Sequence, residues 1–130
     1  MVYRPLVKQE GSGQMTRDEM KELANRMYAA LNAGNLDEVD AIYAADFCSH
    51  AMGATGTGAV KKAWAAVREK FPDLRVSVED MLAEGDKVAV RTVLHGTPAD
   101  QAGEPPPTLM EIIRIADGQI AELWGVSDWR

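Results

Sequence analysis

The sequence has little of what marks a secreted, membrane-spanning or nucleic-acid-binding protein. Its one cysteine, Cys48, has no second cysteine for an intramolecular disulfide and cannot build a cysteine-rich zinc site. No apolar run approaches the roughly 20 residues that span a bilayer. The 14 basic residues stand against 20 acidic ones, and this net charge of −6 disfavours binding to phosphate backbones. Because the N-terminus also lacks a signal-peptide pattern, we expect a cytoplasmic protein that binds neither nucleic acid nor membranes.

The length and composition fit one globular domain. The chain has 130 residues, of which 46% are hydrophobic and 26% are charged, and a domain takes roughly 100 to 200 residues. Residues 1–13 contain Pro5 and end in Gly-Ser-Gly, which is typical of a flexible N-terminal arm. We therefore predict a single domain over residues 14–130.

Helical periodicity dominates the first half of the chain. Residues 16–19 have the Thr-x-x-Glu spacing of a capping box, and apolar residues then recur every three to four positions up to Gly34. The same cap spacing recurs at residues 35–38 and predicts a second helix that stops around Asp46. A third helix is expected after a glycine-rich loop and before Pro72. That loop lacks the Gly-Lys-Ser/Thr ending of a phosphate-binding loop, which argues against a nucleotide site.

The second half of the chain has the two-residue period of strands. The alternation predicts four of them, at residues 74–79, 87–95, 109–115 and 120–127. Residues 98–107 hold four of the six prolines and are therefore expected to form a loop. Helices followed by strands predict an α+β domain, with the helices on one face of a mostly antiparallel sheet.

One carboxylate, Glu111, stands in an otherwise apolar strand. Burying a carboxylate is costly unless it is paired or used, so two interpretations are open. Glu111 either pairs with Arg91 or Arg114 on an exposed face, or enters a cavity as an acid/base group. Glu111 and Arg114 must point to opposite faces, and we expect Glu111 inside, with a raised pKa. A two-residue turn in the following hairpin would place it opposite Trp124, and a three-residue turn opposite Leu123.

Other side chains suggest fewer roles. His50 follows the second predicted helix and is either an acid/base group or a loop residue bonded to backbone. His95 is expected at the surface or at an interface. Two distant histidines and one cysteine give no metal-ligand spacing, and Ser49 lacks a nucleophile-elbow pattern, so we expect no metal, no cofactor and no covalent acyl catalysis.

A set of adaptable or flat apolar side chains could line a pocket for a polycyclic or terpenoid-like ligand, although core packing explains them equally well. The set is Met27, Tyr43, Met52, Trp64 and Met81.

Three segments carry a family resemblance: LNAGNL at 31–36, FPDL at 71–74 and RIADGQIAELW at 114–124. Through these segments the chain, over about residues 17–128, resembles the SnoaL-like polyketide cyclases of the nuclear-transport-factor-two-like superfamily, which includes the ketosteroid isomerases. The resemblance implies a cone-shaped α+β barrel around a deep apolar pocket, often dimeric through the outside of the sheet. Members cyclise, isomerise, dehydrate or open epoxides, and several only bind ligands, so the fold does not choose the reaction.

The resemblance also bears on single residues. Glu111 aligns with the oxyanion-hole aspartic acid of the ketosteroid isomerases, and His50 lies near their general base. Met27 stands where those isomerases have a tyrosine, and Gly125 stands where the SnoaL-type cyclases have an acid/base aspartate. Asp128 is a poor substitute because a three-residue offset changes its face.

Together these features predict a small cofactor-independent SnoaL-like enzyme. It would act by acid/base catalysis, through Glu111 and His50, on an apolar polyketide-like or other secondary-metabolite substrate. We also expect a homodimer. The alternative is a non-catalytic small-molecule-binding or dimerisation module of the same fold.

Overall fold

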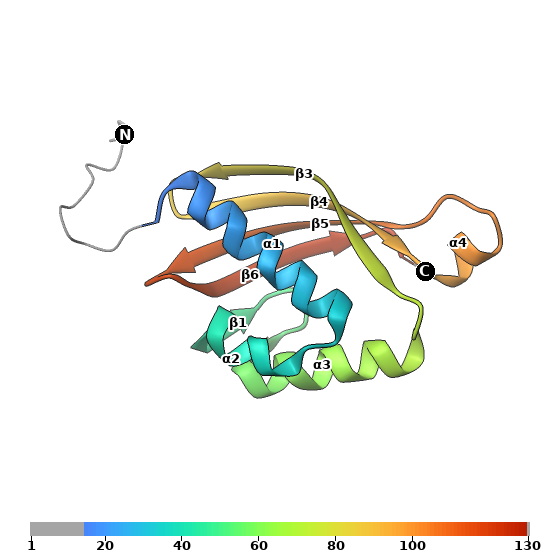
Figure 1. Cartoon of the computed structure of the whole chain (residues 1–130), viewed down its shortest axis with the longest axis horizontal. Helices are drawn as coiled ribbons and strands as arrows, with labels where there is room; N and C mark the ends of the chain where they lie inside the picture. The colour runs from blue at the N-terminus through green and yellow to red at the C-terminus, as the bar shows by residue number, and fades with distance from the viewer. Residues whose placement is uncertain (1–14, 130) are drawn as a thin grey trace.

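A six-stranded curved sheet carries the fold, and helices cover one of its faces (Figure 1). The computed structural model describes residues 15–129, so the predicted arm at residues 1–13 lies outside the described residues. The elements in chain order are α1 (Arg17–Ala33), the 3-10 turn η1 (Leu36–Glu38), α2 (Val39–Ile42), β1 (Tyr43–Ser49), β2 (Ala54–Thr55), α3 (Thr57–Lys70), β3 (Arg75–Glu84), β4 (Lys87–His95), α4 (Pro98–Gln101), β5 (Thr108–Ala116) and β6 (Gln119–Ser127).

The sheet has the strand order β2-β1-β6-β5-β4-β3, and all its pairs are antiparallel except the parallel pair β1 and β6. The predicted α+β class is confirmed, while the curved sheet does not close into a barrel. The proline-rich segment is a loop, as predicted, apart from the single turn of α4.

Helix α1 begins and ends where the local sequence predicts. The Thr16 hydroxyl accepts the Glu19 backbone N–H at 3.1 Å, and the Glu19 carboxylate accepts the Thr16 N–H at 2.8 Å. Gly34 ends the helix with a φ of 67°, a left-handed conformation that favours glycine. The buried face of α1 packs against β3 and β4, and Figure 1 shows the helix crossing the sheet.

The predicted extent of the second helix is wrong. Asn35 makes no side-chain cap, and after one 3-10 turn the helix ends at Ile42 rather than near Asp46. Tyr43 instead begins β1, where it pairs with Ile120 of β6. The helical spacing of the apolar residues stops at the point where pairing with a distant strand becomes available, and the tertiary pairing overrides the local pattern.

The β5–β6 hairpin fixes where Glu111 lies. Asp117 and Gly118 form a two-residue turn, both with positive φ (52° and 77°), which matches the twist of the flanking strands. After Gln119 and Ile120, which follow the turn and pair regularly, β6 has a bulge at Ala121 that shifts the register by one residue. Glu111 therefore pairs with Gly125.

Both registers expected for Glu111 are wrong, because neither turn length accounts for a bulge placed after a two-residue turn. The predicted divergence is present nevertheless. Arg114 lies on the outer face and bonds Glu122, whereas Glu111 lies on the inner face, toward α1.

The two faces of the sheet differ in cover. The inner face contributes most of the core, with Val88, Val90 and Ile113 nearly inaccessible beneath α1. On the outer face, an apolar row crosses four paired strands, and it consists of Leu82, Ala89, Ile112 and Trp124. Among residues 15–129, no helix combines the length and the apolar character needed to cross a membrane.

Candidate functional site

An apolar pocket, here called the Glu111 pocket, lies between the inner face of the sheet and helices α1 and α3. Its cavity measures about 140 Å³. The lining is Met27, Tyr28, Leu31, Tyr43, Phe47, Ser49, Ala51, Met52, Val60, Trp64, Val76, Leu109, Glu111 and Leu123. Glu111 is the one ionisable carboxylate among these side chains, so any proton chemistry in the pocket centres on it.

A short hydrogen bond holds Glu111 in place. The Tyr28 hydroxyl on α1 donates to Glu111 Oε1 on β5 at 2.6 Å. Tyr28 is 3% exposed and Glu111 is partly buried, so the bond lies largely away from water. A phenol donating to a carboxylate is among the stronger protein hydrogen bonds, and it leaves Oε2 available to a ligand.

The surroundings shift the pKa values of three groups. Burial raises the pKa of Glu111, and the hydrogen bond from Tyr28 opposes part of that rise. Burial, and then the nearby Glu111 charge, raise the pKa of both Tyr28 and Tyr43 well above the usual range of a phenol. The two tyrosines therefore keep their protons at neutral pH, and Glu111 is the group whose pKa moves toward it.

Gly125 lies directly beside the Glu111 side chain. It pairs directly with Glu111 across the β5–β6 ladder and faces the same side of the sheet. A Cβ at Gly125 would lie 3.3 Å from Glu111 Cγ and 3.6 Å from Oε2. The position where the resemblance places an aspartate therefore touches Glu111 and here carries no side chain.

Four of the five residues expected to line a pocket do so: Met27, Tyr43, Met52 and Trp64. Met81 does not. It lies on the inner face of β3, where it is partly buried and packs against the core. The reason is positional, because Met81 pairs with Val90 at a place on the sheet that the pocket does not reach.

The structure does not bring His50 to Glu111. Ser49 points inward as the last residue of β1, and the next residue turns outward, leaving the His50 side chain 43% exposed. Its Nε2 lies 2.8 Å from a carboxylate oxygen of Glu122, and its ring stacks on Trp124 with centroids 4.8 Å apart. His95 is also on the outer face, with Nε2 2.9 Å from the Ser77 hydroxyl.

Sequence reasoning missed Tyr28. It counted this residue as part of the apolar stripe of the first helix, and the family comparison placed Met27 at the tyrosine position. The hydroxyl comes from the next residue, which shares the buried face of α1. The available signal was the amphipathic nature of tyrosine, because a buried phenol needs a hydrogen-bond partner.

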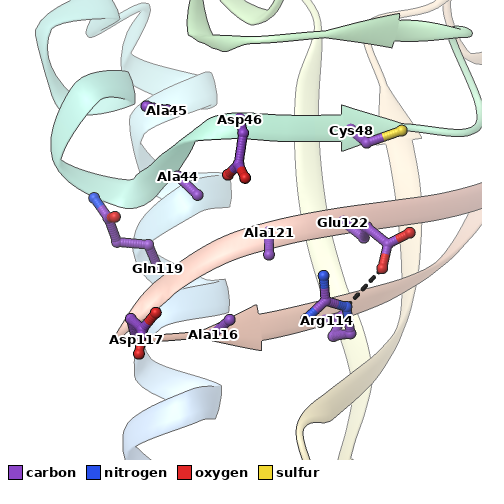
Figure 2. Close-up of a pocket in the computed structure, with 10 residues that line it drawn as sticks. All are labelled: Ala44, Ala45, Asp46, Cys48, Arg114, Ala116, Asp117, Gln119, Ala121 and Glu122. Atoms are coloured by element: carbon purple, nitrogen blue, oxygen red, sulfur yellow. Dashed lines mark hydrogen bonds and ion pairs between the residues drawn. The ribbon is translucent and has the colours of Figure 1, made fainter.

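A second hollow lies between β1 and β6 and measures about 420 Å³ (Figure 2). It exists because the register between these strands shifts between Tyr43 and Cys48. Figure 2 shows Arg114 bonded to Glu122 in its wall, with Asp46 and Cys48 on the opposite strand. Its charged groups are exposed or half-buried, so it lacks the water-excluded acid of the Glu111 pocket.

No group of three or more histidine, cysteine, aspartate or glutamate side chains within residues 15–129 is arranged to hold a metal ion.

The chain belongs to the SnoaL-like polyketide cyclase family, whose sequence model matches residues 21–129. Among solved structures, a candidate polyketide cyclase from Bacillus cereus ATCC 10987 has a TM-score of 0.74 at 29% identity, covering 85% of this chain and 74% of that chain. IdmH, a candidate polyketide cyclase from Streptomyces antibioticus, has a TM-score of 0.71 at 28% identity, covering 84% and 91%.

A third similar structure carries a different activity in its description. AclR, a candidate hydroxylase from Streptomyces galilaeus, has a TM-score of 0.73 at 28% identity, covering 88% of this chain and 82% of that one. Among curated proteins, none matches this sequence. Family membership therefore identifies a SnoaL-like enzyme class without naming the reaction.

Proposed function

We propose that the protein is a cofactor-independent SnoaL-like enzyme that cyclises, isomerises, dehydrates or opens its substrate by proton transfer in the Glu111 pocket. The observation that carries this function is the Tyr28–Glu111 hydrogen bond of 2.6 Å inside an apolar cavity. An acid with a raised pKa in such a site can give a proton to a substrate and take one back.

Each group in the pocket has a distinct role in this proposal. Glu111 is the catalytic residue: its carboxyl transfers a proton to the substrate, becomes a carboxylate, and regains a proton from a second substrate position. Tyr28 is the positioning residue, since its O–H remains directed at Oε1 and leaves Oε2 to face the substrate. The apolar wall excludes water, which strengthens these interactions. His50 has no part in this step because it lies on the outer face.

Substitution of the carboxyl group tests this function. We expect Glu111→Gln to abolish nearly all turnover of a panel of enolisable, cyclisable and epoxide substrates, while the circular dichroism spectrum and apolar-ligand binding are retained. Glu122→Gln is the matched control, because it removes a carboxylate from the outer face of the same hairpin. If Glu111→Gln keeps most of the activity, or the wild type binds ligands and turns over none of the panel, the non-catalytic binding module becomes the better description.

We further propose that two copies of the chain pair through the outer face of the sheet. Leu82, which begins the apolar row, is 72% exposed, and Val126, which adjoins the row, is 74% exposed. Contiguous exposed apolar surface of this kind favours a protein contact. Analytical ultracentrifugation at micromolar concentration should give a dimer, and Ile112→Lys a monomer. A monomeric wild type would contradict this proposal.

A further inference from the structure

The size of the Glu111 pocket limits what can reach the carboxylate. Its cavity of about 140 Å³ is close to the ~150 Å³ of an apolar protein cavity that holds one benzene molecule. Pockets for drug-sized ligands start at about 300 Å³. A fused polycyclic molecule would not fit unless the wall moved, so roughly one six-membered ring is the limit for the part beside Glu111.

The wall of the pocket has a rigid side and an open side. Met27 is buried on α1, and the Trp64 ring packs edge-on against Tyr43 with centroids 6.1 Å apart. Met52 follows β1 in a turn and is 49% exposed while still lining the cavity. A ligand therefore enters past Met52, and Met27 and Trp64 limit its depth.

The Tyr43 hydroxyl is a hydrogen-bond donor without an acceptor among the described residues. The residue is 3% exposed, and its hydroxyl has no hydrogen-bond partner among residues 15–129; because no enclosed side-chain oxygen in this part of the chain lacks a partner, the Tyr43 hydroxyl must be accessible from the cavity that the residue lines. The rings of Phe47 and Trp64 hold its own ring by edge contacts. A donor that is accessible from an apolar cavity and has no acceptor from the protein is available to a ligand oxygen placed there.

The charges of the lining side chains also limit the chemical class of the ligand. No lysine, arginine or histidine lines the cavity, so a carboxylate or phosphate on the ligand would be buried without a counter-ion beside Glu111. An ammonium group would lose its hydration to mostly apolar side chains. A neutral molecule with one hydrogen-bond acceptor is the remaining class.

We infer, building on the acid/base function proposed above, that the substrate is a neutral carbonyl compound with a single ring at its reacting end, and that its carbonyl oxygen accepts the Tyr43 hydroxyl proton in a hydrogen bond. Such a molecule is smaller than the polycyclic ligand that the aromatic and methionine side chains of the lining suggest by themselves. It also gives Tyr43 a role distinct from that of Tyr28, whose hydroxyl is already bonded to Glu111.

Methyl NMR of the full chain tests the size limit directly. Acetophenone should shift the methyl signals of Met27 and Met52 but not that of Met81, which lies outside the pocket and serves as an internal control. A naphthyl methyl ketone and a four-ring steroid enone should bind at least about tenfold more weakly. Benzoate, which carries a charge, should not bind.

Variants test the volume of the pocket and the hydrogen bond from Tyr43 separately. Met27→Ala should reduce or reverse the preference for acetophenone over the naphthyl ketone, and Leu31→Ala makes a similar enlargement at a less buried position if Met27→Ala does not fold. Met81→Ala shortens a methionine outside the pocket and is the matched control, which should leave this preference unchanged. Tyr43→Phe should weaken acetophenone binding about tenfold and leave that of ethylbenzene, which has no acceptor, unchanged.

The outcomes distinguish this inference from the proposed function. Equal or tighter binding of the larger ketones, or a Tyr43→Phe variant that binds acetophenone as the wild type does, would overturn the inference even if Glu111 is catalytic. Tight single-ring binding with no turnover would support the ligand class and count against the enzyme. Binding of none of the probes would overturn the inference.

Discussion

The Tyr28 hydroxyl and the Glu111 carboxylate are 83 residues apart in sequence and 2.6 Å apart in the fold, where their hydrogen bond joins α1 to β5. The helix and the strand thus share a contact that is both structural and chemical. Tyr28 lowers the pKa of an acid that burial raises, so the helix tunes the group that the strand supplies.

Removing the Tyr28 hydroxyl should change both the pKa of Glu111 and the stability of the fold, and the two changes can be measured separately. In Tyr28→Phe the pKa of Glu111 should rise further, because the lost hydrogen bond is the contact that lowers it. The free energy of unfolding should fall by about 1 kcal/mol, since a partly buried acceptor loses its partner. Carbon-13 NMR titration of the Glu111 carboxyl would measure the first change and urea unfolding the second. A pKa that falls would contradict this account of the pair.

The pH dependence of stability has a definite sign. The folded state holds the Glu111 proton more tightly than the unfolded chain, whose glutamates titrate near ~4.3. The contribution of Glu111 is thus fully present below that pH and is lost as the pH rises through the folded pKa. The stability of the wild type minus that of Glu111→Gln should therefore decrease as the pH rises above ~4.3, measured by urea unfolding at each pH. A difference that increases over this range would mean that the folded state favours the carboxylate.

His50 provides a negative test. Its side chain is exposed and pairs with Glu122 outside the pocket, and exposed ion pairs contribute little to stability. His50→Ala should therefore retain turnover and melt near the wild-type temperature. Loss of turnover in a folded His50→Ala variant would show that the reaction does not depend on Glu111 alone.

Gly125 should prove sensitive although it lies in an ordinary strand. In Gly125→Ala the new methyl group would lie 3.3 Å from Glu111 Cγ, and this tight contact displaces the flexible carboxylate side chain rather than the backbone. We expect a lower kcat with little change in melting temperature. Val126→Ala, at the exposed next position, is the matched control. Wild-type kinetics in Gly125→Ala would show that the position of Glu111 tolerates this shift.

Arg68 should be a large contributor to the stability of the site. Its guanidinium donates to the carbonyls of Leu31 at 2.6 Å and Asn32 at 2.7 Å in the last turn of α1, where the Leu31 carbonyl also accepts the Gly34 N–H at 3.1 Å. Arg68→Met keeps the aliphatic stem and should lower the free energy of unfolding by about 2 kcal/mol. Exposed Lys62→Ala on the same helix should have little effect. Chemical denaturation of both variants measures the difference.

Much of the fold follows from local signals in the sequence. The start and end of α1 depend on residues three or four positions apart and on Gly34, so they could be predicted. The strands β4 and β5 follow from alternation. The end of the second helix could not be predicted, because Tyr43 becomes a strand residue only through its pairing with β6, about 75 positions later.

The same difference between local and long-range signals applies to the candidate site. Glu111 could be identified because a carboxylate contrasts with apolar neighbours in its own strand, whereas its partner Tyr28 resembled the other buried residues of α1. The placement of His50 depended on one step in alternation at the end of β1, where Ser49 points inward and the next residue outward. Contacts made across the fold leave no periodic signal, and these were the ones missed.

The bulge at Ala121 makes the register of the hairpin a determinant of what lies beside Glu111. If Ala121 were paired in the ladder instead of bulging, β6 would follow the simple register of its two-residue turn, and Trp124 would replace Gly125 opposite Glu111. An indole there would press on the carboxylate, since even a Cβ at Gly125 would lie 3.3 Å from Glu111 Cγ. A change of one position in strand register could therefore block the site without altering any lining residue of α1 or α3, and hairpin register is a route by which related chains can gain or lose a ligand site on an unchanged scaffold.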